Sequence, residues 1–309
     1  MNPLTGIYGV ASGIRNGLYD HGVLKRQRLT RPVVSVGNLS TGGSGKTPFV
    51  VALGELLKAR GIRFDVLSRG YRRKTRGVLV VEPDGSAADF GDEPLLIARR
   101  LGAPVVVGES RYEAGRLAEK KFESQLHILD DGFQHRSLVR DFDIVLMTGQ
   151  EFEDRLLPAG KLREPLSSLK RADVIVLPAD AKVDEAKLYG KSLWRMKREI
   201  VVEGTPASPV VFCGIARPAQ FFAQVRAAGI IPAAELTFRD HHSYQRRDLL
   251  RLKTAQGRLK AGGFLTTEKD IVNLGTLAED LTPISTARLS LSLERADDVV
   301  DTILTRIRK

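Results

Sequence analysis

The chain has 309 residues, of which 42% are hydrophobic and 28% charged, as in a folded globular protein with one large or two modest domains. Its 48 basic and 37 acidic residues leave a formal net charge of +11, which favours anionic partners such as phosphates or an anionic membrane surface. The single cysteine, Cys213, excludes an intrachain disulfide and a cysteine-based zinc cluster. Aromatic residues are sparse and do not interleave with the basic clusters, so we expect no nucleic-acid partner.

Residues 1–30 are expected to form an amphipathic helix, which is a candidate for membrane contact. Four apolar residues recur there at helical spacing: Ile7, Ala11, Ile14 and Leu18. The basic cluster 25–31 follows, and an apolar stripe next to basic residues is typical of an anchor at an anionic membrane surface. The simpler interpretation is a helix packed on its own domain, and the pattern alone favours it. With no apolar run long enough to cross a bilayer and no signal-peptide pattern, the sequence predicts a cytoplasmic protein, free or bound to a membrane surface.

Short apolar runs alternate with helical stretches in the next part of the chain. The runs cover residues 32–36, 64–68, 104–108, 126–130, 143–147 and 173–177. Most are continuously apolar, which suits strands covered on both faces and therefore a mostly parallel sheet wrapped by helices. The pattern restarts after the linker-like stretch 203–209. The sequence thus predicts an α/β protein with a P-loop core domain at 31–205 and a second, smaller α/β domain at 206–309.

The stretch VGNLSTGGSGKTPFV, residues 36–50, almost matches the phosphate-binding pattern G-x-x-x-x-G-K-[ST], with Ser40 in place of the first glycine. It follows an apolar strand and opens a helix, so its glycines allow backbone N–H groups to face phosphate oxygens. Lys46 would reach the β- and γ-phosphates, and Thr47 would offer its hydroxyl to Mg²⁺. The expected nucleotide-binding residues are Ser40, Thr41, Gly42, Gly43, Ser44, Gly45, Lys46, Thr47 and Pro48.

Acidic residues occur at two other places where chemistry is plausible. Asp130 and Asp131 end an apolar strand, where P-loop proteins hold Mg²⁺, although either carboxylate could instead cap the following turn. Asp92 and Glu93 stand at the start of a helix, and the pattern alone favours capping of that helix. The paired histidines within residues 239–244 suggest metal ligands, but no third ligand is evident and a structural role is favoured.

Two further stretches concern the nucleotide and its phosphates. Residues 68–77 carry five basic residues and no acid, so this loop either binds an anion or is a solvated loop. A guanine-specific site would show N-K-x-D after a later strand, but residues 181–184 read A-K-V-D. Because the asparagine amide that contacts guanine is absent, ATP is the expected nucleotide.

Together these motifs resemble one family, the tetraacyldisaccharide 4′-kinases of lipid A biosynthesis. The shared stretches are VGNLSTGGSGKTP, SRGYRRK, GDEPLLIA, ILDDGFQHR, DRLLPAGKLREP, KRADVIV, FCGIARPAQF, FRDHHSY and TTEKD, in the expected order from residue 36 to about 270. Few other P-loop proteins combine DDGFQHR with a serine at the first glycine position. The sequence departs from the family at Arg217, where Gly-Asn more usually precedes the proline.

The resemblance implies transfer of the γ-phosphoryl of ATP to the 4′-hydroxyl of a tetraacylated glucosamine disaccharide 1-phosphate, which gives lipid IVA. The reaction would take place at the cytoplasmic face of the bacterial inner membrane, and the N-terminal helix is then expected to contact that membrane. The alternative from another class is a P-loop NTPase switch that acts on a protein partner.

The resemblance also assigns roles to individual residues. It implies that Asp92 accepts the proton of the sugar hydroxyl and that His241 orients Asp92 or tunes its pKa. Because His241 belongs to the second domain, the two domains would close over ATP to assemble this pair. The other residues expected in catalysis are Lys46, Asp131 and Arg163, with Glu164 beside them. The residues expected at Mg²⁺ are Thr47, Glu93 and Asp130, and Asp131 is expected at Mg²⁺ or next to its ligands.

Overall fold

The computed structural model describes residues 3–308. The strands within this range form one sheet in the order β10 (Ala234–Thr237), β9 (Val210–Cys213), β11 (Phe264–Thr267), β12 (Ile284–Leu293), β8 (Ser192–Val202), β7 (Val174–Pro178), β6 (Phe142–Leu146), β1 (Val33–Asn38), β5 (Leu126–Asp130), β2 (Phe64–Ser68), β4 (Val105–Val107) and β3 (Leu79–Val80). Neighbours pair in parallel except β8 with β12 and β3 with β4. The predicted mostly parallel α/β sheet is therefore confirmed.

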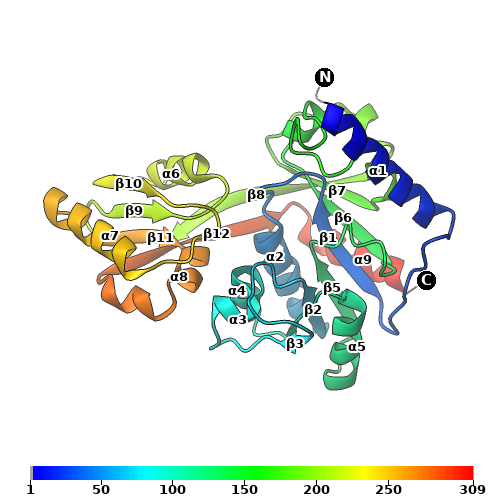
Figure 1. Cartoon of the computed structure of the whole chain (residues 1–309), viewed down its shortest axis with the longest axis horizontal. Helices are drawn as coiled ribbons and strands as arrows, with labels where there is room; N and C mark the ends of the chain where they lie inside the picture. The colour runs from blue at the N-terminus through cyan, green and yellow to red at the C-terminus, as the bar shows by residue number, and fades with distance from the viewer. Residues whose placement is uncertain (1–2, 309) are drawn as a thin grey trace.

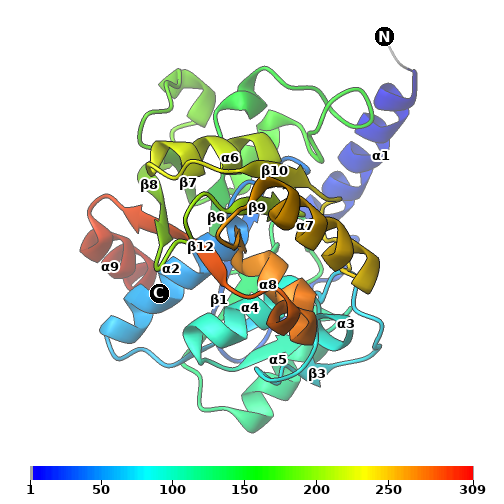
Figure 2. The same ribbon diagram turned by 90° about the vertical axis from the view of Figure 1, so that its left-hand side faces the viewer.

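Helices cover both faces of this sheet. They are α1 (Pro3–Asp20), α2 (Lys46–Ala59), α3 (Ala87–Phe90), α4 (Asp92–Leu101), α5 (Arg111–Lys121), α6 (Pro218–Ala227), α7 (Arg246–Leu259), α8 (Glu268–Leu274) and α9 (Ala296–Ile307), with short 3₁₀ turns at Gln150–Phe152, Leu166–Arg171, Glu185–Leu188 and Gly275–Asp280. Figure 2 shows α6 on one side of β9 and α7 with α8 on the other.

Strand β9 shows why the predicted runs are continuously apolar. Successive side chains of a strand point to opposite faces of the sheet. Phe212 lies in one hydrophobic cluster with Leu252 of α7, whereas Val211 lies in another with Phe221 of α6. Both faces are thus buried under helices, and no position of this strand needs a polar residue.

Strands β8 and β12 run between a larger part around β1 and α2 and a smaller part around β9 and β11 (Figure 1). They pair antiparallel, with Ala287 opposite Val202 and Leu293 opposite Met196. Strand β8 was not predicted, because exposed residues such as Lys197 alternate with less exposed ones and no continuous apolar run marks it. The structure therefore joins both parts through one long antiparallel pair.

The C-terminal helix α9 lies beside α2 of the larger part. Arg60, just after α2, forms ion pairs with Asp297 at 3.2 Å and Asp301 at 3.1 Å. Ile303 of α9 belongs to the same hydrophobic cluster as Val50 of α2. The chain thus returns to the larger part at its end, and the division at residues 31–205 and 206–309 stays a prediction.

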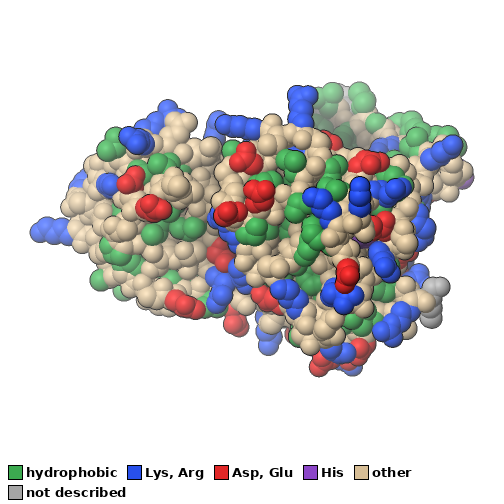
Figure 3. All heavy atoms as spheres, turned by 90° about the horizontal axis from the view of Figure 1, so that it is seen from below, with side chains coloured by type: hydrophobic (Ala, Val, Ile, Leu, Met, Phe, Trp, Pro, Cys, Tyr) green, Lys and Arg blue, Asp and Glu red, His purple; other side chains and the backbone are tan. Residues whose placement is uncertain are grey.

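The surface charge and the helices bear on possible partners. On the face seen in Figure 3, Lys and Arg side chains are interspersed with Asp and Glu side chains. A continuous basic stripe, as nucleic-acid-binding proteins show, is not seen on that face among the described residues. Within residues 3–308, no helix combines the length and the apolar character needed to cross a membrane.

Candidate active site

The loop between β1 and α2 has the geometry of a phosphate-binding loop. Its positive φ angles fall on Gly42 (100°) and Gly45 (87°), conformations that cost glycine little. Ser40 is 4% exposed, and its hydroxyl donates a hydrogen bond to Glu151 at 3.0 Å. Asn38 donates to the carbonyl oxygen of Ser40 at 2.7 Å. A serine at the first glycine position is therefore stable here, because its backbone is ordinary and its hydroxyl has a partner.

Lys46, the first residue of α2, points toward the acidic end of β5. Its Nζ lies 3.1 Å from Asn38 Oδ1 and 3.4 Å from Asp131 Oδ1. Arg163 donates to both carboxylate oxygens of Asp131, at 2.9 and 3.1 Å. Burial opposes the charge of Asp131, but Lys46 and Arg163 outweigh it and hold its pKa well below the usual range. The three predicted catalytic residues Lys46, Asp131 and Arg163 are thus in direct contact.

A close approach of two segments brings Asp131 to this position. Gly37 of β1 faces Phe133, and a Cβ added at Gly37 would lie 2.5 Å from the Phe133 Cβ. Any side chain at residue 37 would therefore push the segment after β5 away from the phosphate-binding loop. Asp131 itself has a φ of 51°, so the chain turns sharply at the end of β5.

Asp130 is placed differently from its neighbour. It is 3% exposed and accepts a hydrogen bond from the Ser68 hydroxyl at 3.0 Å. Burial, followed by the negative charges of Glu93 and Asp131, raises the pKa of Asp130 to about 7. The charge of Lys46 opposes this rise without cancelling it, and Asp130 makes none of the direct ion pairs that Asp131 makes with Lys46 and Arg163 among the described residues.

The predicted Mg²⁺ residues fit a cation that also takes phosphate and water ligands. Thr47, Glu93 and Asp130 line one cavity and offer only oxygen atoms, which Mg²⁺ prefers. No group of three His, Cys, Asp or Glu residues in the described part of the chain is arranged to hold a metal by itself. Mg²⁺ commonly binds through one or two carboxylates plus substrate phosphates, so this arrangement suits it.

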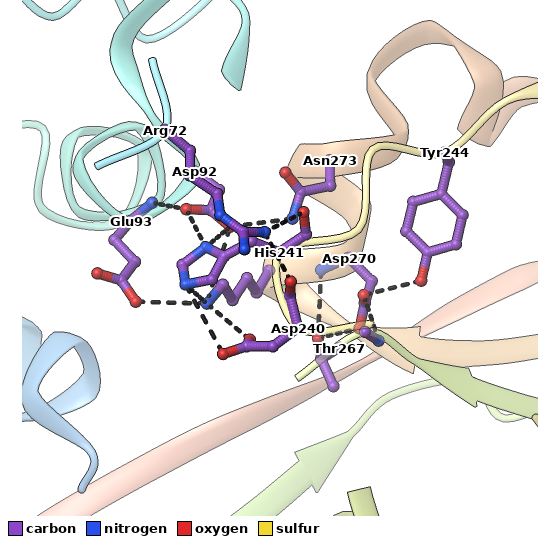
Figure 4. A network of polar contacts seen from close by, with 11 residues as sticks. Arg72, Asp92, Glu93, Asp240, His241, Tyr244, Thr267, Asp270 and Asn273 are labelled. Carbon is purple, nitrogen blue, oxygen red and sulfur yellow. Dashed lines mark hydrogen bonds and ion pairs between the residues drawn. The ribbon is translucent and has the colours of Figure 1, made fainter. Parts of the chain in front are cut away.

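Asp92 and His241 meet where α4 of the larger part faces the smaller part (Figure 4). His241 Nδ1 lies 2.7 Å from Asp92 Oδ2 and 3.0 Å from Oδ1. Asn273 of α8 donates to the same carboxylate at 3.0 Å. Burial would raise the pKa of Asp92, but the hydrogen bond from His241 and the charge of Lys269 lower it to about 2. The structure thus brings together the predicted acid–histidine pair.

Asp92 does not itself line the cavity. It is 4% exposed, and His241 and Lys269 are the cavity-lining residues next to it. An acceptor hydroxyl therefore reaches the Asp92 carboxylate only after these neighbours move. The pattern had favoured helix capping for Asp92, but the N-cap of α4 is Gly91 and this helix has no side-chain cap hydrogen bond. Asp92 is instead the first helical residue, and its carboxylate accepts the N–H of the adjacent Glu93 at 2.9 Å.

Lys269 is a site residue to which the sequence analysis assigned no role. Its Nζ lies 3.2 Å from His241 Nε2, 3.3 Å from Glu93, 3.5 Å from Asp240 and 3.8 Å from Asp92. Burial disfavours its charge, but the carboxylates of Glu93, Asp92 and Asp240 outweigh that cost and raise its pKa. The sequence feature that could have indicated a role for Lys269 is its position in the family motif TTEKD, just after the end of an expected strand.

Two arginines near the phosphate-binding loop were not singled out by residue, although Arg72 belongs to the basic loop 68–77 that was predicted either to bind an anion or to be solvated. Arg198 of β8 donates to the carbonyl oxygen of Ser44 at 2.5 Å, and it lies so close to Gly45 that a Cβ there would be 2.9 Å from Nη2. Arg72, from the predicted basic loop, donates to the backbone carbonyls of Asp240 at 2.8 Å and His241 at 3.2 Å. This part of the basic loop therefore contacts the smaller part of the molecule.

One cavity of about 590 Å³ joins these features. The predicted nucleotide-binding residues 40–48 line it, together with Asp130, Asp131 and Arg163. His241 and Lys269 line it from the smaller part. A phosphate-binding loop, a fixed lysine, an acidic strand end and a nearby carboxylate–histidine pair define an enzyme of the P-loop phosphotransferase class.

Comparison with known proteins identifies the family within this class. A profile described as tetraacyldisaccharide-1-P 4′-kinase matches residues 1–308, and the chain belongs to this family. A tetraacyldisaccharide 4′-kinase from Koribacter versatilis is 48% identical over 100% of this chain and 99% of its own length. One from Aquifex aeolicus is 40% identical over 88% of each chain.

A solved structure agrees with the fold. The crystal structure of LpxK from Aquifex aeolicus in complex with ATP matches with a TM-score of 0.80 at 36% identity, covering 99% of this chain and 97% of that one. These findings confirm the resemblance stated from the motifs and the interpretation as a kinase. They favour it over the alternative of a P-loop NTPase switch.

Proposed function

We propose that this chain transfers the γ-phosphoryl of ATP to the 4′-hydroxyl of tetraacyldisaccharide 1-phosphate, with ADP and lipid IVA as products. The observation that carries the proposal is one cavity lined by the phosphate-binding loop on one side and by His241, hydrogen-bonded to Asp92, on the other. In the reaction a bond forms between the 4′-oxygen of the sugar and the γ-phosphorus. The bond between the γ-phosphorus and the bridging oxygen of the β-phosphate breaks, and ADP leaves. Family membership supports the substrate class.

Each group has a task that its surroundings allow. Residues 40–48 would bind the phosphates through backbone N–H groups, the N-terminus of α2 and Lys46. Asp92 would accept the proton of the 4′-hydroxyl, and His241 would orient Asp92 through its Nδ1–H. Thr47, Glu93 and Asp130 would hold Mg²⁺, which would neutralise part of the phosphate charge when bound.

Arg163 would act on this reaction mainly through Asp131. Its two hydrogen bonds fix the Asp131 carboxylate next to Lys46. Glu164, the neighbouring residue, instead pairs with Arg171 at 2.7 Å and accepts a hydrogen bond from Asn16 of α1 at 2.8 Å. The segment around residue 163 therefore connects the phosphate-binding region with the N-terminal helix.

The direct test uses labelled ATP, Mg²⁺ and tetraacyldisaccharide 1-phosphate, followed by thin-layer separation of the lipids. We expect the label in a new, more polar lipid and ATP consumption that rises strongly with the lipid. ATP consumption that is unchanged by the lipid, or a label that stays in nucleotide and inorganic phosphate, would refute the proposed function.

We also propose that α1 places the enzyme on the cytoplasmic face of the inner membrane. The inner side of α1 is fixed by polar contacts, such as that from the Tyr8 hydroxyl to the Arg163 carbonyl oxygen at 2.9 Å. Its outer side exposes Ile7, Val10 and Ile14, which are 66%, 62% and 60% exposed. Such an apolar stripe suits shallow insertion at a membrane surface. At the membrane surface the enzyme would reach an acceptor whose four acyl chains are held in the bilayer.

In the basic cluster 25–31 after α1, two of the positive charges are partly neutralised by nearby carboxylates. Arg28 pairs with Asp141 at 2.8 Å, and Arg26 lies 3.9 Å from Asp20. We therefore attribute most of the proposed membrane affinity to the apolar stripe.

Replacing Ile7 and Ile14 together by serine is expected to weaken binding to vesicles of anionic and zwitterionic lipids by about tenfold or more, because two apolar side chains that would insert into the membrane are lost. Co-sedimentation with vesicles measures the effect, and the melting temperature should stay unchanged because both side chains are exposed. Ile231→Ser, at a residue 79% exposed in the smaller part, is the matched control. Equal binding of the double variant and the control would contradict the membrane role of α1.

A further inference from the structure

Lys269 is held by several long contacts and by no short one. Its four neighbours, His241 Nε2 and the carboxylates of Glu93, Asp240 and Asp92, lie between 3.2 and 3.8 Å from Nζ. Charge-assisted hydrogen bonds to a carboxylate are usually about 2.7–2.9 Å long. The ammonium group therefore lies among three carboxylates and forms no short hydrogen bond with any of them.

The backbone of Lys269 is firmly placed, although its ammonium group is not. Thr267 caps α8 by accepting the N–H of Asp270, and Asp270 accepts hydrogen bonds from the Tyr244 hydroxyl at 2.8 Å and the Gly214 N–H at 2.8 Å (Figure 4). The stem of Lys269 thus starts from the capped first turn of α8, directly after β11. A lysine on such a base moves its charge by side-chain rotation alone.

Lys269 lines the same cavity as the phosphate-binding loop, from the opposite part of the molecule. Lys46 provides the cation on the α2 side, and Glu93, proposed for Mg²⁺, is the nearest carboxylate to Lys269 at 3.3 Å. A Mg²⁺ ion on Glu93 would weaken that contact, while a terminal phosphate in the cavity would offer the ammonium group a stronger acceptor.

We propose that Lys269 binds the γ-phosphate of ATP, and that His241 and the surrounding carboxylates hold its charge when the γ-phosphate is absent. This inference rests on the proposed function, since it concerns the group that is transferred. Lys269 is the cation that the smaller part contributes to the phosphoryl group.

The same movement would prepare Asp92. Without a γ-phosphate, the contact with Lys269 requires His241 Nε2 to be an acceptor, so the imidazole proton lies on Nδ1 and points to Asp92. When Lys269 turns to the γ-phosphate, Asp92 loses a cation at 3.8 Å and one of the two neighbours that separate it from the cavity. Arrival of ATP would thereby remove one of the two side chains that separate Asp92 from the cavity, and His241 is the other that has to move.

The first test compares ATP with ADP in the presence of Mg²⁺ by calorimetry. Lys269→Met should weaken ATP binding by about tenfold to a hundredfold, the range for one hydrogen bond to a charged group, and change ADP binding less than about twofold. Lys269→Arg should retain most of the preference for ATP, because it keeps a cation there. Lys253→Met, at an exposed residue of α7, is the matched control and should bind both nucleotides as the wild type does. An equal loss for ATP and ADP would refute the proposal.

The second test needs no variant, so it remains decisive if Lys269→Met does not fold. Nitrogen NMR of the histidine side chains should show the His241 Nε2 signal moving when a non-hydrolysable ATP analogue binds, but not when ADP binds. A signal that responds equally to both nucleotides, or to neither, would overturn the proposal. If these results appear but no lipid is labelled, the proposed acceptor is wrong and the role of Lys269 stands.

Discussion

Asp92→Asn is expected to lower kcat by about a thousandfold and to leave the dissociation constant for ATP within about threefold of the wild-type value. The asparagine keeps the shape of the carboxylate and an oxygen that can accept the proton of His241 Nδ1. It cannot, however, take a proton from the sugar hydroxyl. Asp92 also lies outside the cavity lining, so ATP binding does not depend on direct contact with it.

Steady-state kinetics with saturating lipid acceptor measure kcat, and calorimetry measures ATP binding. Asp84→Asn, at an exposed acid before α3, removes the same charge from the surface and should leave both values unchanged. A variant at Asp92 that keeps kcat within threefold of the wild type would exclude this residue as the proton acceptor.

Lys46→Met, unlike Asp92→Asn, is expected to affect both catalysis and ATP binding. It should lower kcat/KM for ATP by about a thousandfold and also weaken ATP binding, since Lys46 is the cation at the start of α2 that faces the phosphates. The change also leaves Asp131, 3.4 Å from Lys46 Nζ, with Arg163 as its only close cation among the described contacts.

The matched control for this variant is Lys120→Met, on the exposed side of α5. It removes the same charge far from the phosphate-binding loop and should behave as the wild type in kinetics and in calorimetry. Normal ATP affinity in Lys46→Met would argue against phosphate binding by this loop and, with it, against the proposed mechanism.

The two adjacent acids of the motif DDGFQHR, Asp130 and Asp131, have different surroundings because of their tertiary contacts. Asp130, the last residue of β5, is buried beside Ser68, and burial together with the negative charges of Glu93 and Asp131 raises its pKa to about 7. The turn at Asp131 instead directs that carboxylate to Lys46 and Arg163. These different surroundings support the proposal that Asp130 binds Mg²⁺ and that Asp131 positions Lys46.

The sequence by itself determined the features that rest on consecutive residues. The phosphate-binding loop was predicted from a strand, a glycine-rich turn and a helix start within residues 36–50, because these elements need no distant partner to be recognised. The parallel sheet followed from continuously apolar strands, since burial on both faces leaves no polar position. The family followed from the order of its motifs.

Only the tertiary structure decided how distant segments meet. His241 contacts Asp92 although 149 positions separate them in the chain, and Lys269 joins the pair from α8. Strand β8 escaped prediction because one of its faces is exposed, yet with β12 it connects the two parts that line the cavity. The physical reason is that local residue patterns report which face of an element is buried, whereas contacts between side chains depend on which elements pack together.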